Sequence, residues 1–210
     1  MLLILQISRT LVAAKPTTRM SVTRRTVSEE AMQAEWAEIQ AAQAQPALFR
    51  PLYDRYFESV FRFIFRRTSD EAIAADLCSQ TFLKAMQKLS TYKFQGVPFS
   101  AWLFRIATNE VAQYFRANSK NRTVSAEDVQ LQDIVAEVSD TDGDKETVRQ
   151  ALIDSLRDLK PADLEIVELR FFEQRAFKEI AGILEITESN AKVRTYRVLE
   201  RLKKHILKRL

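Results

Sequence analysis

A chain of 210 residues is long enough for one average domain or two small ones, and its three glycines and five prolines among many strong helix formers indicate an all-α protein. The net charge of +4 is mild, and the single cysteine, Cys78, excludes an internal disulfide and any multi-cysteine metal site. No apolar run reaches the ~20 residues of a membrane helix, so we expect a cytoplasmic chain without stable membrane insertion.

Residues 1–46 are expected to form an N-terminal extension that is partly disordered. Its opening stretch, MLLILQISRTLVAAKP, is too short for a membrane span and lacks basic residues before its apolar part, so a signal sequence or anchor is the minor alternative. Met20 competes with Met1 as the true start. The following SEEAMQAEWAEIQAAQAQ predicts an appended helix without an assigned use.

Helical patterns fill residues 47–118 and predict a compact bundle. The second of its helices begins at an N-cap, Ser69 or Asp70, and the loop KFQGVP leads into the third, FSAWLFRIATNEVAQYFR, with Pro98 near its first turn. The first helix repeats aromatic residues at helical spacing, a pattern more typical of a buried face than of a ligand site: Tyr53, Phe57, Phe61 and Phe65.

The helix between residues 70 and 92 has an apolar face and a polar face. The apolar face predicts a buried stripe in which the cysteine is a small hydrophobic residue: Ala75, Cys78, Phe82, Ala85, Met86 and Leu89. The polar face contains one leucine and would suit a protein partner, although single exposed leucines are common: Asp76, Ser79, Gln80, Leu83 and Gln87.

The helix FSAWLFRIATNEVAQYFR also separates into two faces on a helical wheel. Its core face holds Leu103, Phe104, Ala107, Val111 and Tyr114. Unpaired nucleic acid needs aromatic and aliphatic surfaces for stacking, amides for base edges and arginines for the backbone. The second face offers all three, unless its tryptophan packs under the preceding loop: Trp102, Arg105, Ile106, Asn109, Gln113 and Arg116.

Residues 119–146 read as a flexible acidic linker, in which LQDIVAEV could form a turn or two of helix. Residues 123–147 carry eight Asp/Glu and one Lys, whereas 84–122 carry seven Lys/Arg and one Glu. Residues 181–210 carry eight Lys/Arg and three Glu. Two basic blocks around an acidic spacer suggest two surfaces for a polyanion, although charge alone also allows solvated helices.

Residues 147–210 predict a second helical domain that ends in a helix-turn-helix. Ile180, Ala181 and Leu184 give its first helix an apolar face, and Thr187 is the expected N-cap of the second. On that second helix Ala191, Thr195, Val198, Leu202 and Ile206 line the inner side. Its outer face favours DNA binding over a merely solvated surface and holds Ser189, Val193, Tyr196, Arg197 and Glu200, flanked by Asn190 and Lys192.

Catalysis is disfavoured by what the sequence lacks. There is no glycine-rich phosphate loop, the only histidine, His205, lies in a basic tail, and Cys78 has no nearby base. We therefore expect no enzyme, no cofactor and no metal.

The motifs AADLCSQTFLKA and FSAWLFRIATNEVAQYFR, followed by an acidic linker and LKPADLEIVELRFFEQRAFKEIAGILEITESNAKVRTYRVLERL, together resemble bacterial sigma factors of the extracytoplasmic-function (ECF) group. The resemblance covers residues 48–117 and 146–208 and implies two helical domains, sigma region 2 and sigma region 4. It implies a subunit that binds core RNA polymerase, directs it to promoter DNA and helps melt it, with an anti-sigma factor as a further partner.

Site residues follow from the resemblance by position. The contact with the clamp helices of the polymerase's largest catalytic subunit falls on Asp76, Leu77, Gln80 and Leu83. Recognition and melting of the minus-ten element fall on Phe94, Phe99, Trp102, Arg105, Ile106, Asn109, Gln113 and Arg116. Duplex recognition at the minus-thirty-five element falls on Asn190, Lys192, Val193, Arg194, Tyr196 and Arg197.

Some positions depart from the family pattern. Ser79-Gln80 stands where Gln-Glu is usual, Gln174 and Glu185 stand where glycine is frequent, and Val193 replaces a usual serine. These changes bear on the polymerase contact and on the minus-thirty-five preference.

Two other functions compete with this interpretation. A self-contained helix-turn-helix regulator, whose first domain senses a ligand or dimerises, would bind duplex tightly without polymerase. A helical adaptor protein would show no salt-sensitive DNA binding.

Overall fold

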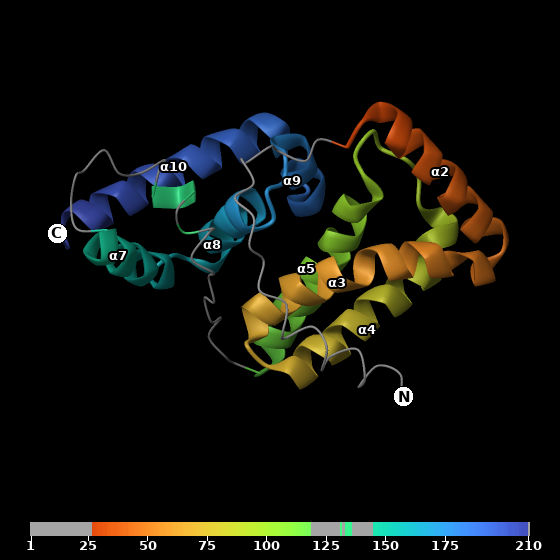
Figure 1. Cartoon of the computed structure of the whole chain (residues 1–210), viewed down its shortest axis with the longest axis horizontal. Helices are drawn as coiled ribbons and strands as arrows, with labels where there is room; N and C mark the ends of the chain where they lie inside the picture. Colours follow the sequence, from red (N-terminus) through yellow and green to blue (C-terminus); the bar gives the residue numbers. More distant parts are fainter. Residues whose placement is uncertain (1–26, 119–130, 132, 136–144, 210) are drawn as a thin grey trace.

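The computed structural model describes residues 27–118, 131, 133–135 and 145–209. Every regular element in these residues is a helix, and the helices form two groups, which confirms the predicted all-α fold of two small domains (Figure 1). No helix among them is long and apolar enough to cross a bilayer. The elements are α2 Glu29–Ala44, η2 Pro46–Phe49, α3 Arg50–Thr68, α4 Glu71–Lys88, η3 Leu89–Thr91, α5 Phe99–Asn118, α7 Lys145–Arg157, α8 Pro161–Val167, the π-helical η4 Glu168–Phe172, α9 Phe177–Leu184 and α10 Glu188–Leu207.

The junction between α3 and α4 shows how local chemistry sets helix ends. Asp70 is the N-cap of α4, because its carboxylate accepts the Ile73 N–H at 3.0 Å. Ser69 instead ends α3 in the left-handed region, with φ of 52°, and donates its N–H to the Phe65 carbonyl at 2.8 Å. Of the two predicted caps, Asp70 is therefore the one used.

The first bundle is built from α3, α4 and α5, with Phe63 and Phe104 meeting edge to face at 4.7 Å between ring centroids. The predicted aromatic stripe on α3 is confirmed in part: Tyr53, Phe57 and Phe61 are half-buried and pack against the core, whereas Phe65 is 40% exposed. A four-residue step turns a helix by about 40° beyond a full turn, so this series drifts away from the core along α3. The buried side chains of α3 are Leu52, Val60, Phe63, Ile64 and Arg67.

The packing face of α4 is rotated from the predicted stripe: Met86 is exposed, Ala75 is only half-buried, and the side chains buried without having been predicted are Ala74, Leu77 and Thr81. Met86 is 46% exposed and not buried, because it lies about 100° around the helix from Ala85, which is in the core. Leu77, predicted on the polymerase-binding surface, is only 4% exposed. The buried positions are Ala74, Leu77, Cys78, Thr81, Phe82 and Ala85.

The segment predicted as an appended helix is α2, and it packs on the first bundle. Ser28 caps it by accepting the Ala31 N–H at 3.2 Å, and Ile39 and Ala42 are buried. Its neighbours are η2, η3 and the start of α5. The predicted boundary between residues 46 and 47 therefore separates α2 from the bundle that α2 packs against. Residues 1–26 of the predicted extension lie outside the described residues.

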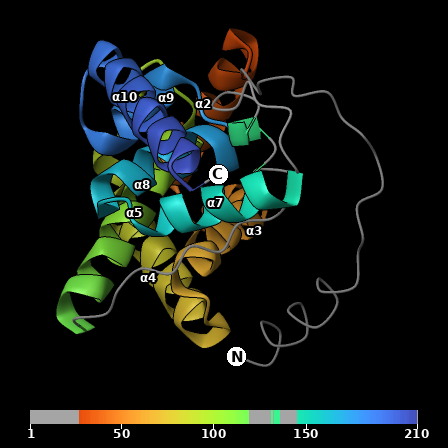
Figure 2. The same cartoon turned by 90° about the vertical axis from the view of Figure 1, so that its left-hand side faces the viewer.

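In the second domain, α10 packs along α7, α8 and α9 (Figures 1 and 2). Thr187 caps α10 by accepting the Asn190 N–H at 3.2 Å, as predicted. Ile180 and Ala181 are buried on α9, and Leu184 is half-buried. The predicted inner side of α10 is buried throughout: Ala191, Thr195, Val198, Leu202 and Ile206.

Most of the predicted linker lies outside the described residues. Within it, residues 131 and 133–135 are helical, and Leu131 and Ile134 are buried. Gln174 of the second domain donates to the Asp133 carboxylate at 3.4 Å. Part of LQDIVAEV therefore packs as helix against the second domain.

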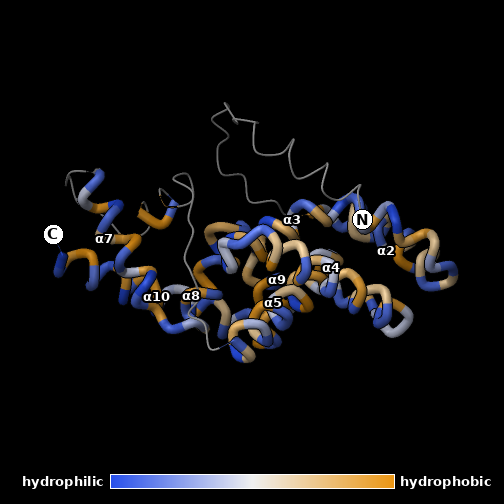
Figure 3. Tube along the Cα trace, turned by 90° about the horizontal axis from the view of Figure 1, so that it is seen from below, coloured by the Kyte–Doolittle hydropathy of each residue, from blue (hydrophilic) through white to orange (hydrophobic). Residues whose placement is uncertain are grey.

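The two domains touch, and α9 lies beside α5 where they meet (Figures 1 and 3). The long axis of the described chain runs from α2 at one end to α7 at the other (Figure 3). The first helix of the helix-turn-helix is therefore docked on the helix predicted to bind unpaired DNA.

Candidate nucleic-acid and polymerase interfaces

An aromatic cluster forms where the loop before α5 meets the start of that helix. The ring centroid of Trp102 lies 4.8 Å from that of Tyr92 and 5.3 Å from that of Phe99. Phe94 stacks on Trp36 of α2, with ring centroids 6.1 Å apart. Phe99 is buried and supports the cluster from beneath, whereas Trp102 and Phe94 keep part of their surface exposed. An indole held in this way offers a stacking surface for an unpaired base.

The remaining predicted residues of α5 do not form one continuous outer face. Ile106 is only 8% exposed, while Asn109, Gln113 and Arg116 are exposed further along the helix. Arg105 pairs with Glu185 of the second domain, Nη1 to Oε1 at 3.0 Å. The wheel treats α5 as a helix with one packing face, whereas α5 packs on α3 and α4 and also on α9.

The loop before α5 also lies against α9. Gly96 has φ of +68°, a conformation that glycine adopts without the cost of a side chain. A Cβ at this position would lie 3.5 Å from Nζ of Lys178, and one at Gly182 would lie 3.9 Å from a methyl group of Val97. We call this arrangement, in which α9 of the second domain packs against α5 of the first, the closed arrangement. In it, α9 covers part of the loop that is predicted to bind the minus-ten element.

Ion pairs join the two domains at the ends of α3 and η4. Arg67 lies 2.7 Å from Glu168, and both side chains are buried. Arg66 pairs with Glu173 beside them. Arg175 donates to the Ser100 hydroxyl at 2.9 Å, and its guanidinium carbon lies 4.1 Å from the centre of a ring in the first bundle, Phe104.

Two departures from the family pattern occupy strained backbone. Gln174 has φ of 51° and Glu185 has φ of 55°, both in the left-handed region that favours glycine. Glu185 ends α9 and donates its N–H to the Ala181 carbonyl. The conformation explains why glycine suits these two places.

The outer face of α10 is accessible despite the contact between domains. Val193 and Tyr196 are the large exposed apolar side chains of this face, and Tyr196 lies beside Phe177 of α9, with ring centroids 6.4 Å apart. Arg194 is half-buried and donates to the Ala162 carbonyl of α8 at 3.3 Å. The other predicted residues are exposed: Asn190, Lys192 and Arg197.

The predicted polymerase-binding strip on α4 is exposed except for its buried Leu77. Gln80 donates to the Asp76 carboxylate at 2.7 Å, which orders both side chains one turn apart. Leu83 is 57% exposed, and exposed Met86 follows it on the same helix. Met86 extends the apolar part of this strip and was missed because the wheel placed it in the core.

Burial raises the pKa of several side chains in the first bundle. Burial raises the pKa of the Cys78 thiol to about 12, so the cysteine is an inert core residue. Burial, together with the nearby Glu35 carboxylate, raises the pKa of Tyr92 to about 12. Burial and a hydrogen bond to Glu35 raise the pKa of Tyr56 as well.

Sequence reasoning missed three side chains of α2 that contact the loop or the start of α5: Glu35, Trp36 and Gln43. A signal for the first was present, because Glu35 lies four residues before Ile39 and so shares its buried face. A single acidic residue on an apolar face predicts a specific buried partner.

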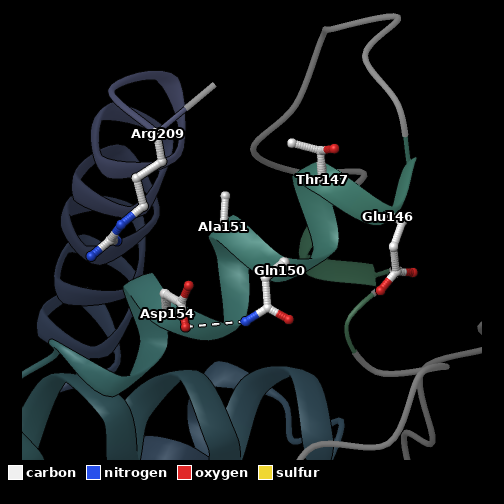
Figure 4. A pocket seen from close by; sticks show the side chains of 6 residues that line it. All are labelled: Glu146, Thr147, Gln150, Ala151, Asp154 and Arg209. Atoms are coloured by element: carbon white, nitrogen blue, oxygen red, sulfur yellow. Dashed lines mark hydrogen bonds between the residues drawn. The ribbon is translucent and has the colours of Figure 1, made fainter.

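A pocket opens far from these surfaces, between α7 and the end of α10 (Figure 4). On its α7 side, Gln150 donates to the Asp154 carboxylate one turn further along the helix, at 3.2 Å. The other side chains around it are Glu146, Thr147, Ala151 and Arg209. None of the predicted site residues lines it.

Comparison with known proteins identifies the family of both domains. Residues 52–121 match the family model of Sigma-70 region 2, and residues 149–202 match that of Sigma-70, region 4. The ECF RNA polymerase sigma factor BldN of Streptomyces coelicolor is 36% identical over 166 residues, which are 78% of this chain and 62% of BldN.

Two solved structures share the fold. CnrH in complex with the cytosolic domain of CnrY has a TM-score of 0.55 at 19% identity, over 80% of this chain and 94% of CnrH. The sigma factor RpoE in complex with the anti-sigma factor NepR from Bartonella quintana has a TM-score of 0.52 at 21% identity, over 76% of this chain and 96% of RpoE. With both sigma regions matched in the family order and an ECF relative spanning them, the chain belongs to the sigma-70 family as an ECF sigma factor.

Proposed function

We propose that the two DNA-binding surfaces of this sigma factor are the aromatic cluster with the exposed end of α5 and the outer face of α10. As a sigma factor, the protein directs core RNA polymerase to promoters and assists melting. The first surface takes the unpaired minus-ten strand: Trp102 and Phe94 stack on bases, Asn109 and Gln113 reach base edges, and Arg116 meets the backbone. The pairing of an aromatic platform in one domain with a helix-turn-helix in the other carries this proposal.

The outer face of α10 reads the minus-thirty-five duplex. Lys192 and Arg197 are exposed cations near the N-terminal half of the helix, where they can bond guanine or phosphate. Asn190, Val193 and Tyr196 complete the surface that enters the major groove. Arg194 lies at the edge of this DNA-binding surface, because its guanidinium donates a hydrogen bond to the Ala162 carbonyl of α8.

The closed arrangement cannot engage both promoter elements together. The minus-ten and minus-thirty-five elements lie about 25 base pairs apart, or about 85 Å along B-DNA. Here α9, which is about 12 Å long and leads directly into α10, touches α5. The domains therefore separate when the protein binds polymerase and promoter.

The exposed strip on α4 binds core polymerase through Asp76, Gln80 and Leu83, with Met86 extending its apolar part. Leu77 supports the strip from the core. RpoE of Bartonella quintana was solved with an anti-sigma factor, and an anti-sigma protein is proposed as a partner of this chain too. The protein acts in the cytoplasm as a regulatory subunit and not as an enzyme.

A reconstituted transcription assay tests the proposed function. Core polymerase with this protein is expected to give run-off transcripts from a selected promoter and to make minus-ten thymines reactive to permanganate. Trp102→Ala should reduce that reactivity while core binding is kept. Absence of any promoter-specific transcript, or tight duplex binding by the free protein without core binding, would overturn the proposal; the second result would favour a self-contained regulator.

Recognition by α10 is tested separately. Arg197→Ala should weaken binding of the holoenzyme to a minus-thirty-five duplex by ~1 to 3 kcal/mol if the guanidinium contacts a base. Arg201→Ala is the matched control, because Arg201 lies one turn further along α10 and pairs with Asp163 of α8 at 2.9 Å. Equal duplex affinity of Arg197→Ala and wild type would remove Arg197 from the recognition surface.

A further inference from the structure

Three side chains of α2 bond or stack on the segment between Leu89 and Phe99, which contains the loop before α5. Gln43 donates through Nε2 to the carbonyls of Leu89 and Tyr92, each at 2.8 Å. Trp36 packs on the rings of Tyr92 and Phe94, with centroids 6.0 and 6.1 Å away. These contacts span 46 or more residues of sequence, so α2 adds long-range restraints to the start of the loop beyond the local bond from the Tyr92 N–H to the Leu89 carbonyl.

Glu35 acts at the other end of the loop, where α5 begins. Its Oε2 accepts the N–H of Phe99, the first residue of α5, at 3.3 Å. Its Oε1 accepts from Arg55 at 3.0 Å and from the Tyr56 hydroxyl. The first N–H groups of a helix lack partners within it and carry partial positive charge, so a buried carboxylate is a suitable cap.

The residue capped by Glu35 packs against the partly exposed Trp102. The ring of Phe99 is 5.3 Å from that of Trp102 and 5.2 Å from that of Tyr92. A shift of the Phe99 backbone would therefore move the two rings on which Trp102 rests. Glu35 itself is nearly sealed from solvent and cannot touch DNA in this arrangement.

We propose that α2 is the support of the minus-ten site and that Glu35 is a positioning residue, which fixes the first residue of α5 so that Trp102 is held ready for an unpaired base. This inference rests on the proposed function of the aromatic cluster. It gives a role to a helix that the sequence left without one.

The experiment compares variants that remove the cap with variants that spare it. Glu35→Ala removes the acceptor of the Phe99 N–H. Glu38→Ala is the matched control, because Glu38 bonds Arg55 at 2.8 and 3.0 Å from the same helix without reaching Phe99. Gln43→Ala frees the other end of the loop and gives a second variant if Glu35→Ala does not fold.

The first readout is spectroscopic and uses the free protein. Trp36 and Trp102 are the only two tryptophans of the chain, so Trp36→Phe leaves Trp102 as the single reporter. In that background, Glu35→Ala should shift Trp102 emission to the red and increase its quenching by acrylamide. Glu38→Ala should leave both close to the parent value.

The second readout uses holoenzyme with an otherwise wild-type chain. Glu35→Ala should slow open-complex formation about tenfold or more, the scale of losing a hydrogen bond to a charged group, while core affinity stays within about twofold. Gln43→Ala should slow it in the same direction, and Glu38→Ala should keep most of the rate.

Wild-type Trp102 emission and wild-type melting rate in Glu35→Ala, or in Gln43→Ala if the first variant does not fold, would overturn the inference. Equal defects in Glu35→Ala and Glu38→Ala would overturn it as well, because they would reduce the role of Glu35 to docking α2 through Arg55. If wild-type holoenzyme melts no promoter, the proposed function fails instead, and the fluorescence of the free protein still tests the cap.

Discussion

Arg67 of α3 and Glu168 of η4 form an ion pair across the domain interface, with Nη2 2.7 Å from Oε2 and side chains only 1% and 3% exposed. Such a pair adds little net stability, but removing one partner strands the other charge in the interior, at a cost of about 3 to 5 kcal/mol. The closed arrangement of the domains is therefore sensitive to single substitutions at this pair.

Glu168→Gln should open the free protein. Separation of the domains lets water reach the Arg67 guanidinium, which relieves the cost of burying it alone. We expect a larger radius of gyration in small-angle X-ray scattering, with helix content unchanged by circular dichroism. Asp163→Asn breaks a partly exposed ion pair within the second domain and should leave the radius unchanged. A radius equal to wild type in Glu168→Gln would show that the pair does not hold the domains together.

Glu185→Gly is expected to release Arg105 for DNA. The substitution removes the partner of Arg105, and since Glu185 is 71% exposed, the lost ion pair costs at most about 1 kcal/mol. It also places glycine at φ of 55°, which should offset the loss by ~1 kcal/mol. Fluorescence anisotropy with an unpaired minus-ten oligonucleotide should show tighter binding and a steeper salt dependence for the variant.

Gln174→Gly separates the relief of backbone strain from the release of Arg105. It relieves a similar left-handed φ of 51°, worth ~1 to 2 kcal/mol, which outweighs the loss of the long hydrogen bond from Gln174 to Asp133, and it leaves the Arg105–Glu185 pair intact. This variant should unfold at a higher temperature than wild type and bind the oligonucleotide equally well. Matching oligonucleotide affinities for Glu185→Gly and Gln174→Gly would mean that Glu185 does not restrain Arg105.

Leu83→Asp should weaken binding to core polymerase. The side chain is 57% exposed beside Met86, and a carboxylate there would be desolvated against an apolar partner surface. Titration of labelled core should show a loss of ~2 kcal/mol or more, the scale of an interface hot spot. Leu48→Asp, at another exposed leucine in η2, is the control and should bind normally. Full core affinity in Leu83→Asp would exclude this face of α4 from the interface.

Patterns local to one helix were predictable from the sequence. The inner side of α10 and the Thr187 cap depend on spacing and on one hydroxyl group, and both are as expected. Ile106 was misplaced because a helical wheel cannot tell how many neighbours a helix has, and Met86 because it was grouped with Ala85, from which it lies about 100° around the helix. Met86 is exposed to solvent on α4, whereas Ile106 is buried on α5, which also packs against α9.

Contacts between distant segments could not be predicted from spacing. The bond between Glu35 and Phe99 spans 64 residues, and that between Arg105 and Glu185 spans 80. The sequence shows each charge but not its partner, because the partner depends on how the helices assemble. The aromatic cluster was therefore expected at the start of α5, whereas its support by α2 was not.

The stability of the first bundle should fall in alkaline solution partly through Cys78. Its pKa is raised by burial from the ordinary 9.0 to about 12, so the unfolded thiol ionises at a lower pH than the folded one. The contribution of the neutral thiol to the free energy of unfolding is fully present below pH 9 and is lost as the pH rises from 9 toward 12. Cys78→Ala removes this contribution and leaves the buried tyrosines in place. The difference in unfolding free energy between wild type and Cys78→Ala, measured by urea titration, should move against wild type by about 1 kcal/mol between pH 9 and pH 10. A difference independent of pH would show that the thiol ionises as readily in the folded chain as in the unfolded one.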